Sequence, residues 1–137
     1  MGGADYLGQP VINHTGINVT DLARSRAFYS SVLAPLGVAL KLDLGDAAGF
    51  GRDQPGKGDD PGGAFWIAQG APHEPRIHIA FTAASRDAVI AFHAAGLAAG
   101  GGDNGAPGLR PQYHKDYFAA FIIDPDGYNI EAVFHGV

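Results

Sequence analysis

Apolar and polar residues alternate over residues 11–20 in the way expected of a half-buried strand. Ile17 and Val19 share one face of this strand, and His14 lies on the other face. The alternation predicts that the apolar face packs on a core and that His14 points to the opposite side of a sheet.

A helix and three more strands are predicted to follow. Asp21 is a suitable N-cap, residues 22–34 have apolar side chains at helical spacing, and Pro35 ends the run. A loop rich in Gly, Pro and Asp separates the last two strands. The three strands are predicted at residues 38–44, 49–52 and 64–69.

The same order then starts again. A strand is predicted at residues 76–82, and Ser85 caps a helix that runs to about Ala99, with Asp87 in its first turn. A glycine-rich loop is predicted from Gly100 to Gly108. The chain closes with a hairpin of residues 117–123 and 128–134, joined by a type I turn with the sequence Asp-Pro-Asp-Gly.

Shifting the sequence by 64 residues against itself supports a tandem repeat. His14 then meets His78, Phe28 meets Phe92, and predicted strands and helices fall on one another. We therefore predict an α+β fold in a single domain, residues 1–137. It contains two βαβββ modules, about 10–70 and about 75–136, which form an open, cupped mixed sheet with the helices outside.

Composition narrows the chemistry. Cysteine is absent, which excludes disulfides, thiolate metal sites and cysteine nucleophiles. The formal net charge of −5 is spread along the chain, and no basic stripe or long apolar run is visible. We therefore expect no nucleic-acid partner and no membrane span. The first residues, 1–5, lack the features of a secretory signal, so a cytoplasmic location is expected.

Three residues carry the predicted site. Strand parity places His14, His78 and Glu131 on the concave face, and the repeat relates the two histidines. Two imidazoles and one carboxylate can form a facial triad for one divalent ion, namely Fe, Mn, Zn or Ni, with open positions for substrate. The alternative is that both histidines are polar strand residues that only form hydrogen bonds.

The same shift of 64 residues aligns Ile67 with Glu131, which predicts three protein ligands and no fourth. Gln69, two residues further on, shares the predicted face and is the only substitute. Phe65 has the same parity and is expected, with Ile67 and Gln69, to line the substrate pocket, whereas Trp66 is assigned to the core.

A polar and aromatic segment precedes the strand at 117–123. If it folds over the cup, His114 or Tyr117 could act as general acid or base, and Arg110 and Tyr113 could bind substrate. The alternative for this segment is an exposed surface loop.

These motifs resemble the vicinal oxygen chelate superfamily, which includes glyoxalase I, fosfomycin-resistance and bleomycin-resistance proteins and extradiol dioxygenases. The resemblance covers nearly the whole chain and is carried by His14 to Tyr29, by His78 to Phe81 and, most specifically, by the closing hairpin from Asp124 to Glu131. In such proteins the two histidines and the final glutamate are metal ligands.

The resemblance implies a divalent-metal-dependent enzyme, either a lyase or isomerase or a dioxygenase, that acts on a small oxygen-chelating substrate. It also implies a homodimer, because such cups often complete themselves across subunits. Glyoxalase I has a fourth ligand on the strand of Ile67, which this chain lacks. The alternative function is a binding protein that sequesters a small toxin or antibiotic in the same cup, of the bleomycin-resistance type.

Overall fold

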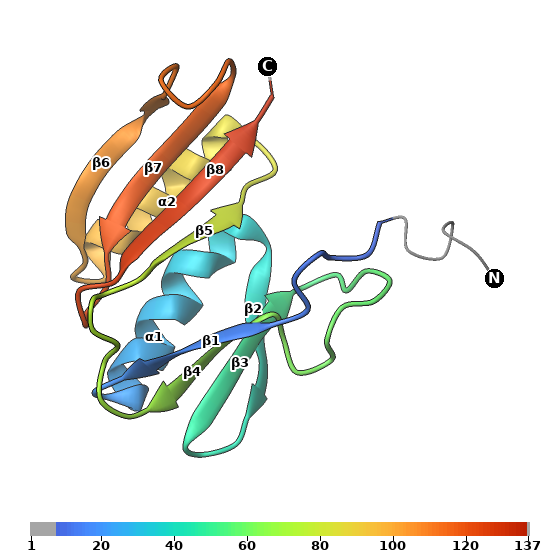
Figure 1. Ribbon diagram of the computed structural model, residues 1–137, viewed down its shortest axis with the longest axis vertical. Coiled ribbons are helices and arrows are strands. Elements are labelled where there is room, and N and C mark those ends of the chain that lie inside the picture. Colours follow the sequence, from blue (N-terminus) through green and yellow to red (C-terminus); the bar gives the residue numbers. More distant parts are fainter. Residues whose placement is uncertain (1–7, 137) are drawn as a thin grey trace.

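The computed structural model describes residues 8–136 of the 137-residue chain. Residues 1–5, from which the absence of a secretory signal was inferred, lie outside the described residues. In the described part, the order of strand, helix and three strands occurs twice, as predicted (Figure 1). In chain order the elements are β1 (Thr15–Val19), α1 (Leu22–Leu33), the 3-10 helix η2 (Ala34–Leu36), β2 (Val38–Asp43), β3 (Ala47–Arg52), β4 (Phe65–Gln69), β5 (His78–Thr82), α2 (Arg86–Ala98), β6 (Gly102–Leu109), β7 (Tyr117–Ile123) and β8 (Asn129–His135).

The strands form two open four-stranded mixed sheets with the orders β1-β4-β3-β2 and β5-β8-β7-β6. In each sheet the first strand of the module pairs in parallel with the last, and the other neighbours are antiparallel. The second sheet has the same strand order as the first, with each strand number higher by four. The α+β fold of two βαβββ modules is therefore confirmed, with β1 and β5 at sheet edges.

Both helices begin at the residues that the sequence indicated. The Asp21 carboxylate accepts a hydrogen bond from the Arg24 N–H at 3.1 Å, and the Ser85 hydroxyl accepts one from the Ala88 N–H at 3.1 Å. Each cap satisfies one of the N–H groups that a helix leaves unpaired at its start. α1 ends in the 3-10 turn η2, and Gly37 follows it with a left-handed φ of 73°.

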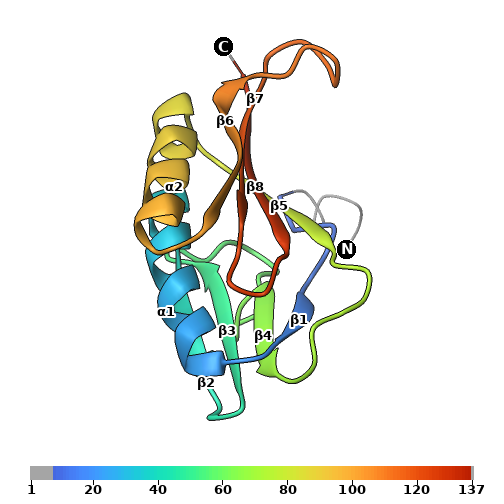
Figure 2. The ribbon, with the colours of Figure 1, turned by 90° about the vertical axis from the view of Figure 1, so that its left-hand side faces the viewer.

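The helices lie on the same side of the two sheets and also pack on each other, so that one core runs through both modules (Figure 2). The faces predicted to lie under the helices do so. Ile17 and Val19 of β1 and Ile130 and Ala132 of β8 are all at most 2% exposed. The opposite face of each sheet, which we call the open face, has no helix on it.

The turn between β7 and β8, in the second module, forms hydrogen bonds with the first module. The predicted turn is confirmed by a hydrogen bond from the Gly127 N–H to the Asp124 carbonyl at 3.0 Å. The buried Tyr29 hydroxyl of α1 donates to Asp124 Oδ2 at 2.5 Å, and the Tyr128 hydroxyl donates to the Asn18 carbonyl of β1 at 2.6 Å. The turn therefore anchors the second module to the first strand and helix.

Two predictions of secondary structure are wrong by more than two residues. The stretch Gly100–Gly108, predicted as a loop, mostly belongs to β6, which pairs with β7 with register shifts around Gly105. Pairing with a strong neighbouring strand overrides the low strand propensity of its glycines. β1 begins at Thr15 and not at residue 11, because the first bond of its ladder runs from the Thr15 N–H to the Ala64 carbonyl.

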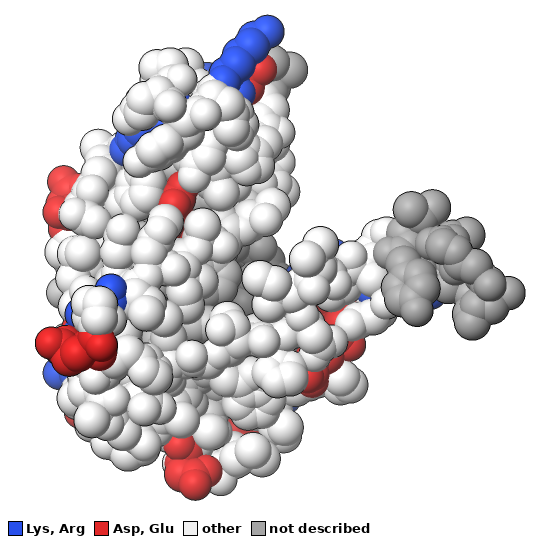
Figure 3. All heavy atoms as spheres, in the orientation of Figure 1, with Lys and Arg blue, Asp and Glu red and all other residues white. Residues whose placement is uncertain are grey.

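The surface shows no charge segregation in the view of Figure 3, where acidic and basic side chains are scattered and the outline is notched between the modules. No helix in residues 8–136 is long and apolar enough to cross a bilayer.

Candidate functional site

The candidate site lies on the open face of the second sheet and is centred on Glu131. This residue of β8 stands opposite Phe121 on β7 and Ala80 on β5, and it is only 1% exposed. Burial of a carboxylate is costly unless other groups bind it. The surroundings of Glu131 therefore indicate a built site rather than a solvated surface acid.

Both carboxylate oxygens of Glu131 have a partner. The Nε2 atom of His78, on β5, lies 2.8 Å from Oε1, and the hydroxyl of Tyr117, on β7, donates to Oε2. Three neighbouring strands each contribute one of these side chains because their open faces are in register. The structure thus brings together two predicted metal ligands and one predicted acid–base residue.

Tyr117 is held in its protonated form. Its burial, and then its hydrogen bond and proximity to the Glu131 carboxylate, raise the pKa of Tyr117 to about 12. A phenolate beside a carboxylate would place two negative charges in contact. Tyr117 is therefore a hydrogen-bond donor throughout the neutral pH range.

A shallow cavity of about 300 Å³ lies beside this cluster, lined by Asn104, Arg110, Tyr113, Phe121 and Asn129 among others. The Arg110 guanidinium lies over the Phe121 ring at 5.4 Å and donates to the Gly108 and Ala106 carbonyls. The predicted substrate residues Arg110 and Tyr113 therefore meet on this face, and a cation and an aromatic ring stand next to Glu131.

His114 lies at the outer end of the same face. Its ring is exposed, contacts Tyr117 at a centroid distance of 5.0 Å and stacks on His135 at 4.9 Å. Its Nδ1 atom is 2.7 Å from the Lys115 carbonyl. The catalytic role predicted for His114 stays a prediction, since it touches Tyr117 and not Glu131 in the contacts seen here.

His14 lies in the other module, just before β1. Its Nδ1 atom is 2.8 Å from Asn13 Oδ1 and 3.2 Å from Asp60 Oδ2, and its side chain is 56% exposed. A carboxylate or amide that binds one ring nitrogen orients the other nitrogen, an arrangement common among metal-binding histidines. In residues 8–136, no three His, Cys, Asp or Glu side chains converge closely enough to hold one ion. A single chain therefore does not bring His14 to His78 and Glu131.

The prediction that Ile67 corresponds to Glu131 is wrong. Gly16 of β1 pairs with Trp66 of β4, whereas Ala80 of β5, its counterpart 64 residues on, pairs with Glu131. Trp66 is therefore the residue at the Glu131 position of the first module. Its indole lies over Gly49 of β3, where an added Cβ would stand only 2.7 Å from the ring. The position of the first module that corresponds to Glu131 therefore still offers no metal ligand, because a tryptophan occupies it and not an isoleucine.

The same shift corrects the residues around Trp66. Phe65 and Ile67, predicted on the concave face, point towards the helices and are at most 2% exposed, with Phe65 in ring contact with Tyr29 at 5.0 Å. Trp66, assigned to the core, is only half-buried and lies on the open face. Gln69 Oε1 accepts the Leu22 N–H at 2.9 Å, so this side chain is engaged at the start of α1.

Sequence reasoning missed three residues of the site, Asp60, Phe121 and Asn129, and it assigned a fourth, Trp66, to the core. Phe121 could have been found, because it shares the parity of Tyr117 in a strand whose range was predicted. Asp60 and Trp66 could not, since the first depends on where a loop folds and the second on a one-residue difference between the repeats.

Comparison with known proteins gives a consistent answer. The sequence model of the glyoxalase/bleomycin resistance protein/dioxygenase superfamily matches residues 11–132. A glyoxalase/bleomycin resistance protein from Albidiferax ferrireducens T118 is 28% identical with a TM-score of 0.75, over 93% of this chain and 100% of that one. No curated protein matches the sequence.

Two more distant structures share the fold. A family enzyme from Burkholderia phytofirmans PsJN is 16% identical with a TM-score of 0.67, over 91% of this chain and 98% of that one. A glyoxalase I mutant from Zea mays is 22% identical with a TM-score of 0.62, over 89% of this chain but only 46% of its own.

Proposed function

The chain belongs to the glyoxalase/bleomycin resistance protein/dioxygenase superfamily, and from this premise we propose that it is a divalent-metal-dependent enzyme acting on a small oxygen-chelating substrate. A lyase or isomerase, or a dioxygenase, fits this proposal. The observation that carries it is the buried Glu131 carboxylate, which has the His78 imidazole on one oxygen and the Tyr117 hydroxyl on the other.

The donor set suits a divalent ion. His78 and Glu131 are 2.8 Å apart, so that one ion beside both could bind an imidazole nitrogen and a carboxylate oxygen. His14 is the third ligand in this proposal, and its contacts with Asn13 and Asp60 leave Nε2 to face the ion. When bound, such an ion supplies Lewis-acid chemistry that polarises a substrate oxygen.

We place the complete site between two copies of the chain. His14 of one copy would meet His78 and Glu131 of the other, since the single chain keeps them apart. β1 and β5 are edge strands, and Thr15 and Gly16 on one and Ala80 on the other are exposed, so both histidines lie on accessible sheet edges. The homodimer expected from the resemblance thus acquires a specific role in this proposal.

The other side chains have assigned tasks. Arg110, stacked on Phe121, would bind an anionic oxygen of the substrate. Tyr117 would hold Glu131 in place with its hydroxyl, which its raised pKa keeps protonated, and it would give up that proton only to a strongly basic atom of the substrate. The cavity of about 300 Å³ fits a small substrate, at the lower end of the usual range of ligand sites.

The direct test is the metal content of untagged protein, purified without chelator and measured by elemental mass spectrometry. We expect about one ion per chain, lost in His14→Ala, His78→Ala and Glu131→Ala. His135→Ala is the matched control, because it removes an exposed histidine from the same strand as Glu131. Absence of metal, even after titration with Fe, Mn, Zn and Ni, would remove the enzyme proposal.

A mixing experiment tests the placement between copies. His14→Ala protein and Glu131→Ala protein each lack every intact site, but a dimer of one with the other has one intact site and one that lacks both residues. Co-refolding the two variants should therefore restore metal binding in part. If each site were built within one chain, mixing would restore nothing.

The rival proposal is a protein that sequesters a ligand without turnover. Trp66 on one open face and Phe121 with Arg110 on the other favour it, because these side chains can stack on an aromatic or charged ligand. Ligand binding that survives both His14→Ala and Glu131→Ala, in protein without metal, would support this function instead.

A further inference from the structure

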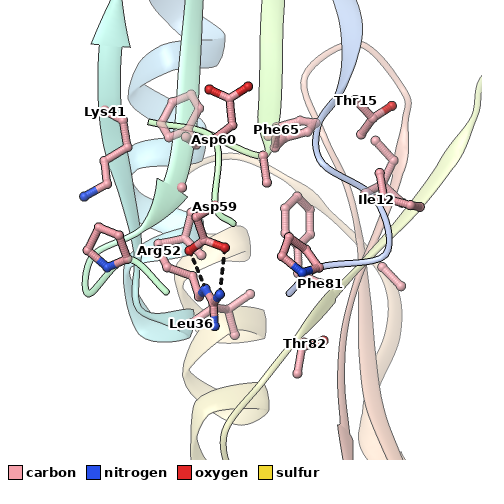
Figure 4. A pocket seen from close by; sticks show the side chains of 18 of the residues that line it. Ile12, Thr15, Leu36, Lys41, Arg52, Asp59, Asp60, Phe65, Phe81 and Thr82 are labelled. Atoms are coloured by element: carbon pink, nitrogen blue, oxygen red, sulfur yellow. Dashed lines mark hydrogen bonds and ion pairs between the residues drawn. The ribbon is translucent and has the colours of Figure 1, made fainter. Parts of the chain in front are cut away.

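A larger cavity of about 640 Å³ lies between the two modules, apart from the cluster of His78, Tyr117 and Glu131, none of which lines it. Its wall includes Leu36 and Phe65 from the first module and Phe81 from β5 (Figure 4). The rings of Phe65 and Phe81 meet edge to face at 5.2 Å. The cavity is thus an apolar, aromatic space with both modules as its walls.

The repeat explains why this cavity exists. The turn before β4 and the turn before β8 contain the same bond, from Gly63 N–H to the Asp60 carbonyl at 2.9 Å and from Gly127 N–H to the Asp124 carbonyl at 3.0 Å. The strands that follow are out of step by one residue, as the pairings of Trp66 and Glu131 show. The second module therefore has one extra residue between its turn and its strand, and that residue is Tyr128.

Tyr128 fills a space between the turn before β8 and the edge of β1, and we call this space and its counterpart in the first module slots. It is 0% exposed, and its hydroxyl donates to the Asn18 carbonyl at 2.6 Å and accepts the His73 N–H at 2.9 Å. The Asn18 carbonyl is available because β1 is an edge strand and this group points away from β4. The phenol ring of Tyr128 thus occupies one of the two related slots, and its hydroxyl forms a hydrogen bond with the edge of β1.

The related slot in the first module has no such ring. Ala64 follows Gly63 directly, and both Ala64 and Thr82 line the cavity. Thr82 lies 64 residues after Asn18, and it occupies the corresponding edge position of β5. The Ala83 N–H bonds to the Val133 carbonyl, so the Thr82 carbonyl points away from β8. In residues 8–136, no hydrogen bond from another group reaches that carbonyl.

We propose that the cavity between the modules binds a neutral aromatic alcohol, whose ring takes the place that Tyr128 fills in the other slot and whose hydroxyl donates to the Thr82 carbonyl. The volume of about 640 Å³ is larger than a single phenol needs, so a fused two-ring compound also fits. The ligand is neutral in this proposal because the charged side chains that line the cavity already have partners within the chain. Arg52 bonds to Asp59 at 2.7 Å, Asp60 contacts His14, and Lys41 donates to the Asp53 carbonyl at 3.4 Å.

The probe is 2-naphthol, whose binding is followed by its own fluorescence and by NMR at neutral pH. 2-Methoxynaphthalene has the same shape but no donor. One net hydrogen bond corresponds to about fivefold in affinity, so 2-naphthol should bind about fivefold more tightly than the ether. Contacts between naphthol protons and the Phe81 and Ile79 side chains, seen as intermolecular NOEs in the unmodified protein, would place the ligand.

Two variants refill the slot: Ala64→Tyr and Ala84→Phe, both at exposed alanines that line the cavity. Each should reduce 2-naphthol binding at least tenfold, whereas Ala94→Tyr, on the exposed side of α2, should leave it unchanged. Equal affinity for the naphthol and its ether, binding unaffected by both refilled variants, or NOEs to residues elsewhere would each overturn the proposal. Loss of metal in Glu131→Ala has no bearing on it, because Glu131 does not line this cavity.

Discussion

Replacing Tyr29 with Phe tests how the two modules are held together. The Tyr29 hydroxyl donates at 2.5 Å to Asp124 Oδ2, and the two residues are 0% and 4% exposed. The other oxygen of Asp124 accepts the N–H groups of Asp126 and Tyr128. Removing one hydroxyl therefore leaves a buried carboxylate oxygen without a partner, while the aromatic ring and its packing remain.

The expected loss follows from this geometry. A hydrogen bond to a charged group contributes about 1.5–3 kcal/mol, and leaving a charged acceptor buried costs more than leaving a neutral one. We therefore expect Tyr29→Phe to lower the free energy of unfolding by about 3 kcal/mol. With about 2.1 cal/mol/K of unfolding entropy per residue, this corresponds to a drop in Tm of about 10 °C.

The loss should also depend on pH. Burial raises the pKa of Asp124 above its ordinary value, although the Tyr29 hydrogen bond and the two backbone N–H groups lower it. A carboxyl whose pKa is raised on folding contributes stability at low pH, and this contribution is lost as pH rises through the folded pKa. Tyr29→Phe removes one bond that favours the charged form, so it should raise the pKa of Asp124 further and cost more at pH 7 than at pH 4.

Urea unfolding followed by circular dichroism at both pH values measures these quantities. Tyr113→Phe is the control, because Tyr113 is 57% exposed, and its change should stay within about 0.5 kcal/mol. A loss below about 1 kcal/mol at pH 7, or an equal loss at pH 4 and pH 7, would refute the view that this hydroxyl stabilises a buried, charged Asp124.

Three other predictions test particular side chains. Because burial and the Glu131 carboxylate raise the pKa of Tyr117 to about 12, Tyr117 should contribute almost no phenolate absorbance below pH 11. The increase in phenolate absorbance between pH 7 and pH 11 should therefore be the same in Tyr117→Phe as in the unmodified protein, and a smaller increase in the variant would show that Tyr117 ionises in this range. Ile67→Glu should prevent folding, judged by circular dichroism at 25 °C, since it buries a charge, whereas Trp66→Glu on the open face should still fold. The opposite result, in which Ile67→Glu folds and Trp66→Glu does not, would show that Ile67 and not Trp66 faces the open side. Tyr128→Phe should lower the free energy of unfolding by about 2 kcal/mol in urea titrations, because it leaves two backbone groups unpaired; a change below about 0.5 kcal/mol would show that water replaces the hydroxyl.

The sequence by itself determined the features that depend on near neighbours. Both helix caps, at Asp21 and Ser85, and the turn at Asp124 rest on hydrogen bonds within four residues. Strand alternation likewise placed His78 and Glu131 on one face, because side chains alternate whatever the strand is paired with. The repeat of two modules followed from the same local patterns.

Only the tertiary structure decided the rest. The glycine-rich stretch became β6 because β7 lies beside it, and propensity could not show that pairing. Trp66, and not Ile67, stands at the position of Glu131 because the second module has one extra residue, Tyr128, between its turn and β8, and a shift of one residue exchanges the two faces of a strand. His14 stands apart from Glu131 because the packed helices set the distance between the modules, which no local pattern encodes.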